Sequence, residues 1–209
     1  MYATRNAHIC REDARSVLAP SGLWEDAGMA IEVVPYSKDW PTQFERLAED
    51  LRQALIAVSV ESIEHVGSTS VAGLAAKPIL DIDIIVGRTD VAAAVAALED
   101  VGYRHCGDLG VTGREAFTAP NEEPRRHVYV CAAGGLNVRN HLAVRDVLRR
   151  RDDLRDEYAA VKLELASDPT IDIGRYLARK SAVLQSVLEE SDLSDDERRQ
   201  ILQLNNPTT

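Results

Sequence analysis

Residues 62–86, SIEHVGSTSVAGLAAKPILDIDIIV, contain two apolar segments joined through a turn that carries glycine and serine. The first segment ends at Gly67-Ser68, twelve residues separate Ser68 from Asp81, and Asp81-Ile82-Asp83 stands inside the second apolar segment. Side chains two residues apart in a β-strand point to the same face. We therefore expect Asp81 and Asp83 to project together, with the neighbouring leucine and isoleucines on the other face.

Two adjacent carboxylates on an apolar strand need a positive partner, because burial and mutual repulsion disfavour their charged forms. Oxygen ligands of this kind suit Mg²⁺, which commonly takes one or two carboxylates together with phosphate oxygens and water. Gly67 allows a close backbone approach, and the Ser68 hydroxyl can bind a phosphate. Lys77 could balance the charge of a triphosphate. The alternative for Asp81 and Asp83 is an edge strand with a solvated acidic face.

Strand and helix patterns alternate outward from this stretch. An apolar face at three- and four-residue steps predicts a helix that begins near Pro41 and continues to Val58. A second helix, capped by Thr89 or Asp90, closes at Gly102. The chain after Gly134-Gly135 is helical, with segments around 142–148, 154–165 and 173–188. Strands are expected at 31–36, 62–66, 79–87, 103–107, 115–119 and 126–131. These patterns predict one α/β domain, rich in sheet in its N-terminal part, with a helical C-terminal part packed on it.

The two ends of the chain differ from its middle. Residues 1–28 are either an N-terminal arm, expected to be disordered, or a stretch that precedes a true start at Met29. The main domain is expected to cover residues 29–190, and residues 191–209 form an acidic tail. Ser194 and the acidic residues after it predict the start of a short terminal helix that continues through Leu204.

Composition and charge exclude several classes of protein. The 209 residues are 45% hydrophobic and 28% charged, which excludes wholesale disorder. The net charge is −10, which argues against duplex nucleic acid as a partner, because such affinity comes mainly from cations on phosphates. No stretch approaches the about 18 apolar residues of a membrane span, and no secretory signal is evident. Three cysteines without a CxxC pattern predict reduced thiols, no zinc site and a cytoplasmic protein.

A glycine-serine turn followed by Asp-x-Asp in an apolar strand resembles the nucleotidyltransferase superfamily typified by DNA polymerase beta. More closely, residues 31–188 resemble the GrpB family. That resemblance implies a nucleotidyltransferase-like fold, a mixed β-sheet flanked by helices. Its landmarks in this chain are Val34-Pro35-Tyr36, Asp39-Trp40-Pro41, His65 to Val71, Gly73-Leu74, Ala76 to Ile79, Asp81-Ile82-Asp83, Arg145-Asp146, Leu148-Arg149, Tyr158, Lys162, Tyr176 and Lys180.

The resemblance has one departure, because active members of the superfamily usually add a third carboxylate from a later strand. The strand expected at 126–131 has no acidic residue and instead places His127 and Tyr129 on one face. His127 is a candidate metal ligand or base, and the alternative is a polar or satisfied core group. Cations at Arg145, Arg149, Lys162 and Lys180 line a phosphate pocket if the C-terminal helices cover the sheet, and are otherwise solvated helix faces.

These residues predict a Mg²⁺-dependent nucleotidyltransferase that transfers a nucleoside monophosphate from a nucleoside triphosphate to an acceptor of unknown identity. Asp81 and Asp83 would carry the metal and the catalysis, and Gly67, Ser68, Lys77 and Arg145 would bind the nucleotide. The alternatives are an inactive module that binds a nucleotide or a CoA-like ligand, and an accessory domain of a partner such as dephospho-CoA kinase. The Rossmann and P-loop patterns are absent from the sequence. The oligomeric state is left open.

Overall fold

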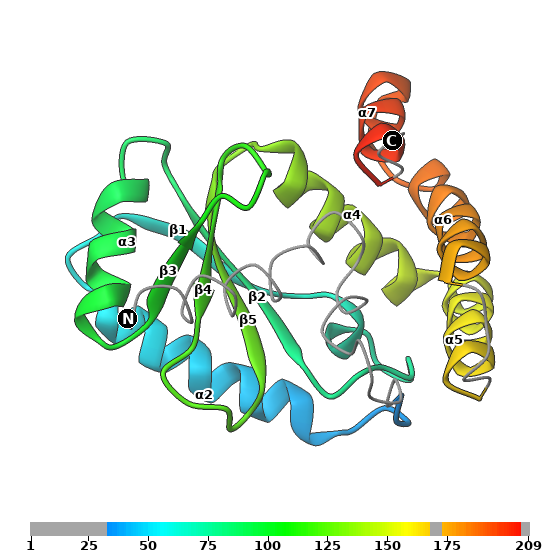
Figure 1. Cartoon of the computed structure of the whole chain (residues 1–209), viewed down its shortest axis with the longest axis horizontal. Helices are drawn as coiled ribbons and strands as arrows, with labels where there is room; N and C mark the ends of the chain where they lie inside the picture. The colour runs from blue at the N-terminus through cyan, green and yellow to red at the C-terminus, as the bar shows by residue number, and fades with distance from the viewer. Residues whose placement is uncertain (1–32, 168–172, 206–209) are drawn as a thin grey trace, which may run out of the picture.

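The computed structural model describes residues 33–167 and 173–205, in which five strands form one sheet (Figure 1). The sheet order is β1-β2-β5-β4-β3, with β2 parallel to β5 and the other neighbours antiparallel. The expectation of a mixed sheet is therefore confirmed, with strands close to the predicted positions. The strands are β1 (Val60–Val66), β2 (Leu80–Val86), β3 (Arg104–Gly107), β4 (Arg114–Thr118) and β5 (Arg126–Ala132).

Helices cover both faces of the sheet, as predicted. The helices α2 (Asp39–Ala54) and α3 (Val91–Asp100) pack on one face, and α4 (Leu136–Arg150) crosses the other. The chain continues through α5 (Asp152–Ser167), α6 (Ile173–Glu189) and α7 (Asp195–Asn205), which pack against α4. Figure 1 shows these last three helices on one side of the molecule, so the helical C-terminal part lies against the α4 face of the sheet.

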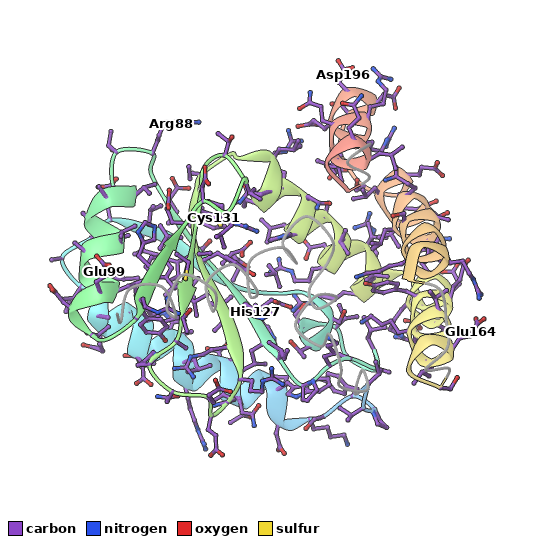
Figure 2. All side chains as sticks on the ribbon, viewed as in Figure 1. Arg88, Glu99, His127, Cys131, Glu164 and Asp196 are labelled. Carbon is purple, nitrogen blue, oxygen red and sulfur yellow. The ribbon has the colours of Figure 1, made fainter. Side chains whose placement is uncertain are left out.

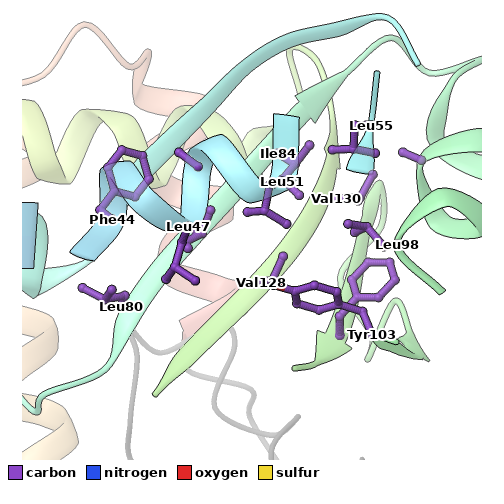
Figure 3. Close-up of a cluster of buried hydrophobic side chains, with 14 of the residues drawn as sticks. Phe44, Leu47, Leu51, Leu55, Leu80, Ile84, Leu98, Tyr103, Val128 and Val130 are labelled. Atoms are coloured by element: carbon purple, nitrogen blue, oxygen red, sulfur yellow. The ribbon is translucent and has the colours of Figure 1, made fainter. Parts of the chain in front are cut away.

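The main hydrophobic core lies between the sheet and α2. Leu80, Ile82 and Ile84 of β2 point into it, where they meet Phe44 and Leu51 of α2 (Figure 3). These side chains are all less than a tenth exposed, so the apolar half of the predicted alternation is confirmed. The side chains at positions 81, 83 and 85 of β2 point to the opposite face of the sheet, which α4 covers. Burial of one strand face against α2 therefore fixes which residues can form a site under α4.

Two expectations about local structure are wrong. Of the predicted strand 31–36, the described residues form only an isolated bridge between Val34 and Ala76, with two backbone hydrogen bonds of 2.9 and 3.0 Å. Pro35 has no N–H to donate, so a ladder cannot continue past it. The prediction of three reduced thiols is wrong for Cys106, which is disulfide-bonded, whereas Cys131 is free and buried. A cysteine count alone leaves room for one pair and one free thiol.

The C-terminal helix α7 begins where the sequence places it. The Ser194 hydroxyl accepts a hydrogen bond from the Glu197 N–H, and the Glu197 carboxylate accepts one from the Ser194 N–H. This reciprocal pair is a capping box, and it satisfies two backbone donors at the helix start. Ile201 of α7 is buried together with Leu188 and Leu193, so the acidic segment carries a helix that packs on the domain. The predicted arm, residues 1–28, lies outside the described residues. No helix in the described parts is both long and apolar enough to span a bilayer.

Candidate active site

The turn after β1 is built around Gly67. Its φ is +68°, a left-handed backbone conformation that glycine adopts without steric cost. A Cβ atom at this position would lie 2.1 Å from the Asp81 Oδ2 atom, so the carboxylate rests directly against the turn. Ser68 to Ser70 then form a short 3-10 turn, and the Ser70 hydroxyl donates to the Gly67 carbonyl at 2.6 Å. The structure thus brings the predicted turn and the first predicted carboxylate into contact.

Asp81 and Asp83 both project to the α4 face of β2, as the alternation predicts. Asp81 is 6% exposed and Asp83 is fully buried. The alternative of a solvated acidic edge is wrong, because β2 lies between β1 and β5 in the interior of the sheet. The Asp83 Oδ1 atom has no hydrogen-bond partner in the part of the chain that the structure describes. A buried carboxylate oxygen in that state is suited to bind a cation.

Two histidines hold the other carboxylate oxygens. On the adjacent strand β5, His127 lies opposite Asp81 in the register, and its Nδ1 is 2.9 Å from Asp81 Oδ1. From α4, His141 brings its Nδ1 to 2.7 Å from Asp83 Oδ2. Burial lowers the pKa of His141, but the Asp83 carboxylate outweighs this and the net pKa is raised, which favours the imidazolium. Figure 2 labels His127 on β5, along the strand from Cys131.

Buried lysines from the C-terminal helices reach the same turn. Lys162 of α5 donates to the Ser68 hydroxyl oxygen and, at 3.2 Å, to the Ala75 carbonyl. Burial lowers the pKa of Lys162 well below its usual value, and the nearby charge of Lys180 adds to this. Burial and the charge of Lys77 likewise lower the pKa of Lys180, to about 7. The lowered pKa values favour the neutral amines, and an anion bound beside the turn would favour their charged forms.

Arg145 is placed differently from its predicted role. Its guanidinium binds Glu64 of β1 at 2.6 Å and the neighbouring Asp146 at 2.7 Å, and it also donates to the His65 carbonyl at 3.3 Å. Arg149, one helical turn later, donates through Nε and Nη2 to the Ser70 carbonyl, at 3.1 and 2.9 Å. Neither arginine is a simple solvated side chain. Both contact the segment that forms the turn, while Lys162 approaches Ser68 from α5.

A buried arginine completes the charge of the site. Arg114 of β4 is fully buried, with its guanidinium carbon 4.6 Å from the centre of the Tyr129 ring and electrostatically coupled to Asp83. Burial lowers the pKa of Arg114, and burial raises that of the Tyr129 phenol, so the phenol stays protonated. Tyr129 lies opposite Asp83 in the β2–β5 register. Strand β5 is the strand in which the resemblance led us to expect a third carboxylate.

The comparisons with known proteins agree with this arrangement of motifs. A family model described as GrpB protein matches residues 30–190. The chain belongs to the GrpB family. A UPF0157 protein of Halalkalibacterium halodurans is 33% identical over 78% of this chain and 83% of its own length. The UPF0157 protein YqkA of Bacillus subtilis is 28% identical over 77% of this chain, which spans only 47% of that longer relative.

A solved structure of the same family supports the fold. The conserved protein GrpB from Enterococcus faecalis is 30% identical and superposes with a TM-score of 0.65, covering 76% of this chain and 98% of that one. The family named from the sequence is thereby confirmed. The curated relatives carry family names without a stated reaction, so the activity of this GrpB-family chain has to be inferred from its own residues.

The carboxylates of this GrpB-family protein fit Mg²⁺ as part of a mixed coordination shell. Among residues 33–167 and 173–205, no three His, Cys, Asp or Glu side chains converge on a ready-made metal site. That is compatible with Mg²⁺, which is usually held by one or two carboxylates and completed by phosphate oxygens and water. Each histidine bonds one oxygen of its carboxylate, so Asp81 Oδ2 and Asp83 Oδ1 are the oxygens that remain to coordinate a metal ion. Hydrogen bonds of that kind orient ligating carboxylates.

Two hollows lie on the sheet outside the carboxylate pair. An open groove of about 880 Å³ runs between α2 and the loop before β5, lined by residues such as Arg46, Tyr103 and Arg126. None of the predicted site residues lines it. A smaller hollow of about 90 Å³ is lined by His127, Arg125 and Phe117, so it adjoins the carboxylates through His127. The chemistry of the site lies with the charged residues under α4 and not with the larger groove.

Sequence reasoning missed His141 and Arg114. His141 lies four residues before Arg145 and eight before Arg149, which places all three on one face of α4. That spacing was a usable signal, although it does not say which strand the face would meet. Arg114 offered no comparable signal, because a single arginine in a short strand is more often exposed.

His65 is a structural member of the site. Its ring stacks on Phe44 with centroids 4.7 Å apart, and its Nε2 lies 3.0 Å from the Thr69 hydroxyl, which donates to the Ile79 carbonyl. Burial lowers the pKa of His65 to about 4, and the charges of Arg149 and Arg145 add to this against the opposing effect of Asp81. The neutral ring therefore bonds Thr69 and links the turn to the start of β2.

His65 is expected to make the folded protein less stable as the pH is lowered from neutral. Its folded pKa lies below the unfolded value, so its contribution is complete above about pH 6.5 and is lost as the pH falls towards about 4. Between about pH 7 and about pH 5, wild type should lose about 2 kcal/mol more than His65→Gln, whose amide can still donate to Thr69. Urea unfolding of both proteins measures the difference, which cancels the titration of other groups. Parallel stability curves would contradict the assignment.

Proposed function

We propose that this GrpB-family chain is a Mg²⁺-dependent nucleotidyltransferase that transfers a nucleoside monophosphate from a nucleoside triphosphate to an acceptor. The observation that carries the proposal is the contact of Asp81 with Gly67, beside Ser68 and Lys162. A carboxylate pair, a glycine-serine turn and a buried lysine thus meet at one place. Each is common alone, and together they match the needs of phosphoryl transfer, which is mainly positioning and charge neutralisation.

The phosphate tail is assigned to the turn and the lysines. Ser68 offers its hydroxyl, and Lys162 already contacts that hydroxyl. Lys180 is buried and Lys77 is half-buried, and their mutual repulsion is relieved when an anion binds between them. Because these lysines come from α5, α6 and the segment before β2, the C-terminal helices complete a site that the sheet begins.

Asp81 and Asp83 are the residues that would hold the metal, which when bound would polarise the α-phosphate and offset charge on the leaving pyrophosphate. His127 and His141 keep the carboxylates oriented through the bonds of 2.9 and 2.7 Å. His127 remains a predicted metal ligand after the two carboxylates, because its Nδ1 already bonds Asp81. In the transfer step the acceptor oxygen forms a bond to the α-phosphorus, the bond to the bridging oxygen breaks, and pyrophosphate departs.

Two competing interpretations exist, and the missing third carboxylate is the main support for the first, a binding module. Strand β5 presents His127 and Tyr129 to the site and contributes no acid there. A protein of this kind could bind a nucleotide or a CoA-like ligand without turning it over, or serve as an accessory domain of a partner enzyme. The distinction lies in product formation, because only a transferase releases pyrophosphate.

Calorimetric titration of the full chain with ATP, GTP, CTP and UTP, with and without Mg²⁺, tests the proposal. We expect one nucleotide to bind with Mg²⁺, and Lys162→Met to weaken that binding by at least about tenfold, or about 1.4 kcal/mol. Lys38→Met is the matched control, because Lys38 is exposed and lies just before the first turn of α2. Failure of all four nucleotides to bind would contradict the proposal. Binding without pyrophosphate release in a screen of acceptors would favour the binding module.

A further inference from the structure

One face of α4 contacts three successive parts of the site. His141, Arg145 and Arg149 are spaced four residues apart, so their side chains lie in a row along the helix. His141 binds Asp83, Arg145 reaches Glu64 and the His65 carbonyl, and Arg149 reaches the Ser70 carbonyl. The row therefore follows the sheet from the second carboxylate to both ends of the turn.

The two arginines bind the backbone on opposite sides of Gly67. The His65 carbonyl lies two residues before the glycine and the Ser70 carbonyl three residues after it. Within the turn itself, the Ser70 N–H bonds the Gly67 carbonyl at 3.3 Å and the Val71 N–H bonds the Ser68 carbonyl at 3.2 Å, both near the long end of the usual range. Besides the 2.6 Å bond from the Ser70 hydroxyl to the Gly67 carbonyl, the contacts that hold this turn come from residues outside it, the two arginines among them.

The two arginines differ in how their charge is matched. Arg145 is held by two carboxylates, those of Glu64 and Asp146. Arg149 directs two N–H groups at a single carbonyl, and no salt bridge to it is found among residues 33–167 and 173–205. Its planar guanidinium makes a two-donor contact that a lysine ammonium cannot reproduce.

We infer that Arg145 and Arg149 are positioning residues that clamp the phosphate-binding turn from outside, with Arg149 making the decisive contact. This inference rests on the proposed function for the identity of the ligand, and on the observed bonds for the clamp. It replaces the predicted role of Arg145 as a direct nucleotide ligand. Because these bonds already hold the turn in one conformation, little conformational entropy is lost when a phosphate binds to it.

Hydrogen–deuterium exchange of the unliganded full chain tests the clamp without any nucleotide. In Arg149→Ala, the amides of residues 69–71 should exchange at least about tenfold faster, as local opening becomes easier. Arg150→Ala is the matched control, since Arg150 is the next residue and bonds the Glu190 carbonyl instead of the turn, so it should leave those amides unchanged. Unchanged exchange at 69–71 in both Arg145→Ala and Arg149→Ala would overturn the inference.

A second measurement separates positioning from general stability. Titration with inorganic tripolyphosphate should show about tenfold weaker binding for Arg149→Ala, with only partial recovery in Arg149→Lys and an unchanged melting temperature for the lysine variant. Full recovery in Arg149→Lys would overturn the two-donor contact. If wild type does not bind tripolyphosphate, the proposed function fails, while the exchange experiment still decides whether the clamp exists. If Arg149→Ala does not fold, Arg149→Lys carries the exchange measurement in its place.

Discussion

A Gly67→Ala variant is expected to lose nucleotide binding and to unfold at lower urea concentration than wild type. An alanine at φ +68° and ψ −172° costs about 1–3 kcal/mol, because this backbone region is essentially confined to glycine. The same Cβ would lie 2.1 Å from Asp81 Oδ2, so either the turn or the carboxylate must move. Forced repacking of this kind typically adds about 1–3 kcal/mol. Both movements separate the turn from Asp81, which is the contact that the proposed reaction needs.

Gly110→Ala is the control that isolates the second effect. Gly110 has φ +84°, and a Cβ there would meet nothing within 4 Å. It therefore carries the cost of a positive φ without the collision. We expect Gly110→Ala to bind nucleotide as wild type does and to lose only the smaller amount of stability in urea unfolding. If the two variants lose equal stability and Gly67→Ala still binds nucleotide, close approach of Asp81 to the turn is not required.

The sheet side of the site was predictable from the sequence because its signals are local. The alternation of side chains along a strand placed Asp81 and Asp83 on one face. It placed the apolar residues at 80, 82 and 84 on the other face, where burial in the core was expected. The turn was recognisable because glycine is the residue for which a left-handed conformation is inexpensive. The helix predicted from Pro41 to Val58 is observed at Asp39–Ala54, so its end was predicted four residues too late, while its face of Phe44, Leu47 and Leu51 is buried as expected.

The helix side of the site was not predictable in the same way. The contact of His141 with Asp83 joins residues 58 positions apart, and that of Arg149 with Ser70 joins residues 79 apart. Helical spacing shows that His141, Arg145 and Arg149 share a face, but only the packing of α4 on the sheet decides what that face meets. The strand expected at 31–36 failed for a local reason, since Pro35 interrupts the donors that a ladder needs.

The two carboxylates are expected to respond differently to neutralisation, although both belong to the proposed metal site. Asp81 faces Lys162 and Lys180, whose lowered pKa values let them release a proton when the negative charge is removed. Asp83 faces Arg114, which is fully buried and cannot deprotonate in the usual pH range. Asp83→Asn therefore removes a negative charge that acts electrostatically on Arg114, a buried cation that cannot lose its proton, whereas the lysines near Asp81 can lose theirs.

Asp81→Asn should retain nearly the stability of wild type and lose Mg²⁺-dependent nucleotide binding. Asp83→Asn should lose binding as well, and also about 3 kcal/mol of stability, the order of magnitude found when one partner of a buried ion pair is removed. Urea unfolding and calorimetric titration of the two single variants measure these outcomes. Equal stability of the two variants would show that Arg114 does not depend on Asp83.

Arg114→Met in the Asp83→Asn background decides the cause of that loss. If the loss comes from an uncompensated arginine, replacing the arginine with an apolar side chain of similar length should restore most of the stability, while nucleotide binding stays absent. If the loss comes instead from the broken contact between Asp83 and His141, the added substitution should leave the stability low. Recovery of stability without recovery of binding would assign Asp83 two separate tasks, one as the counter-ion of Arg114 and one at the phosphate site.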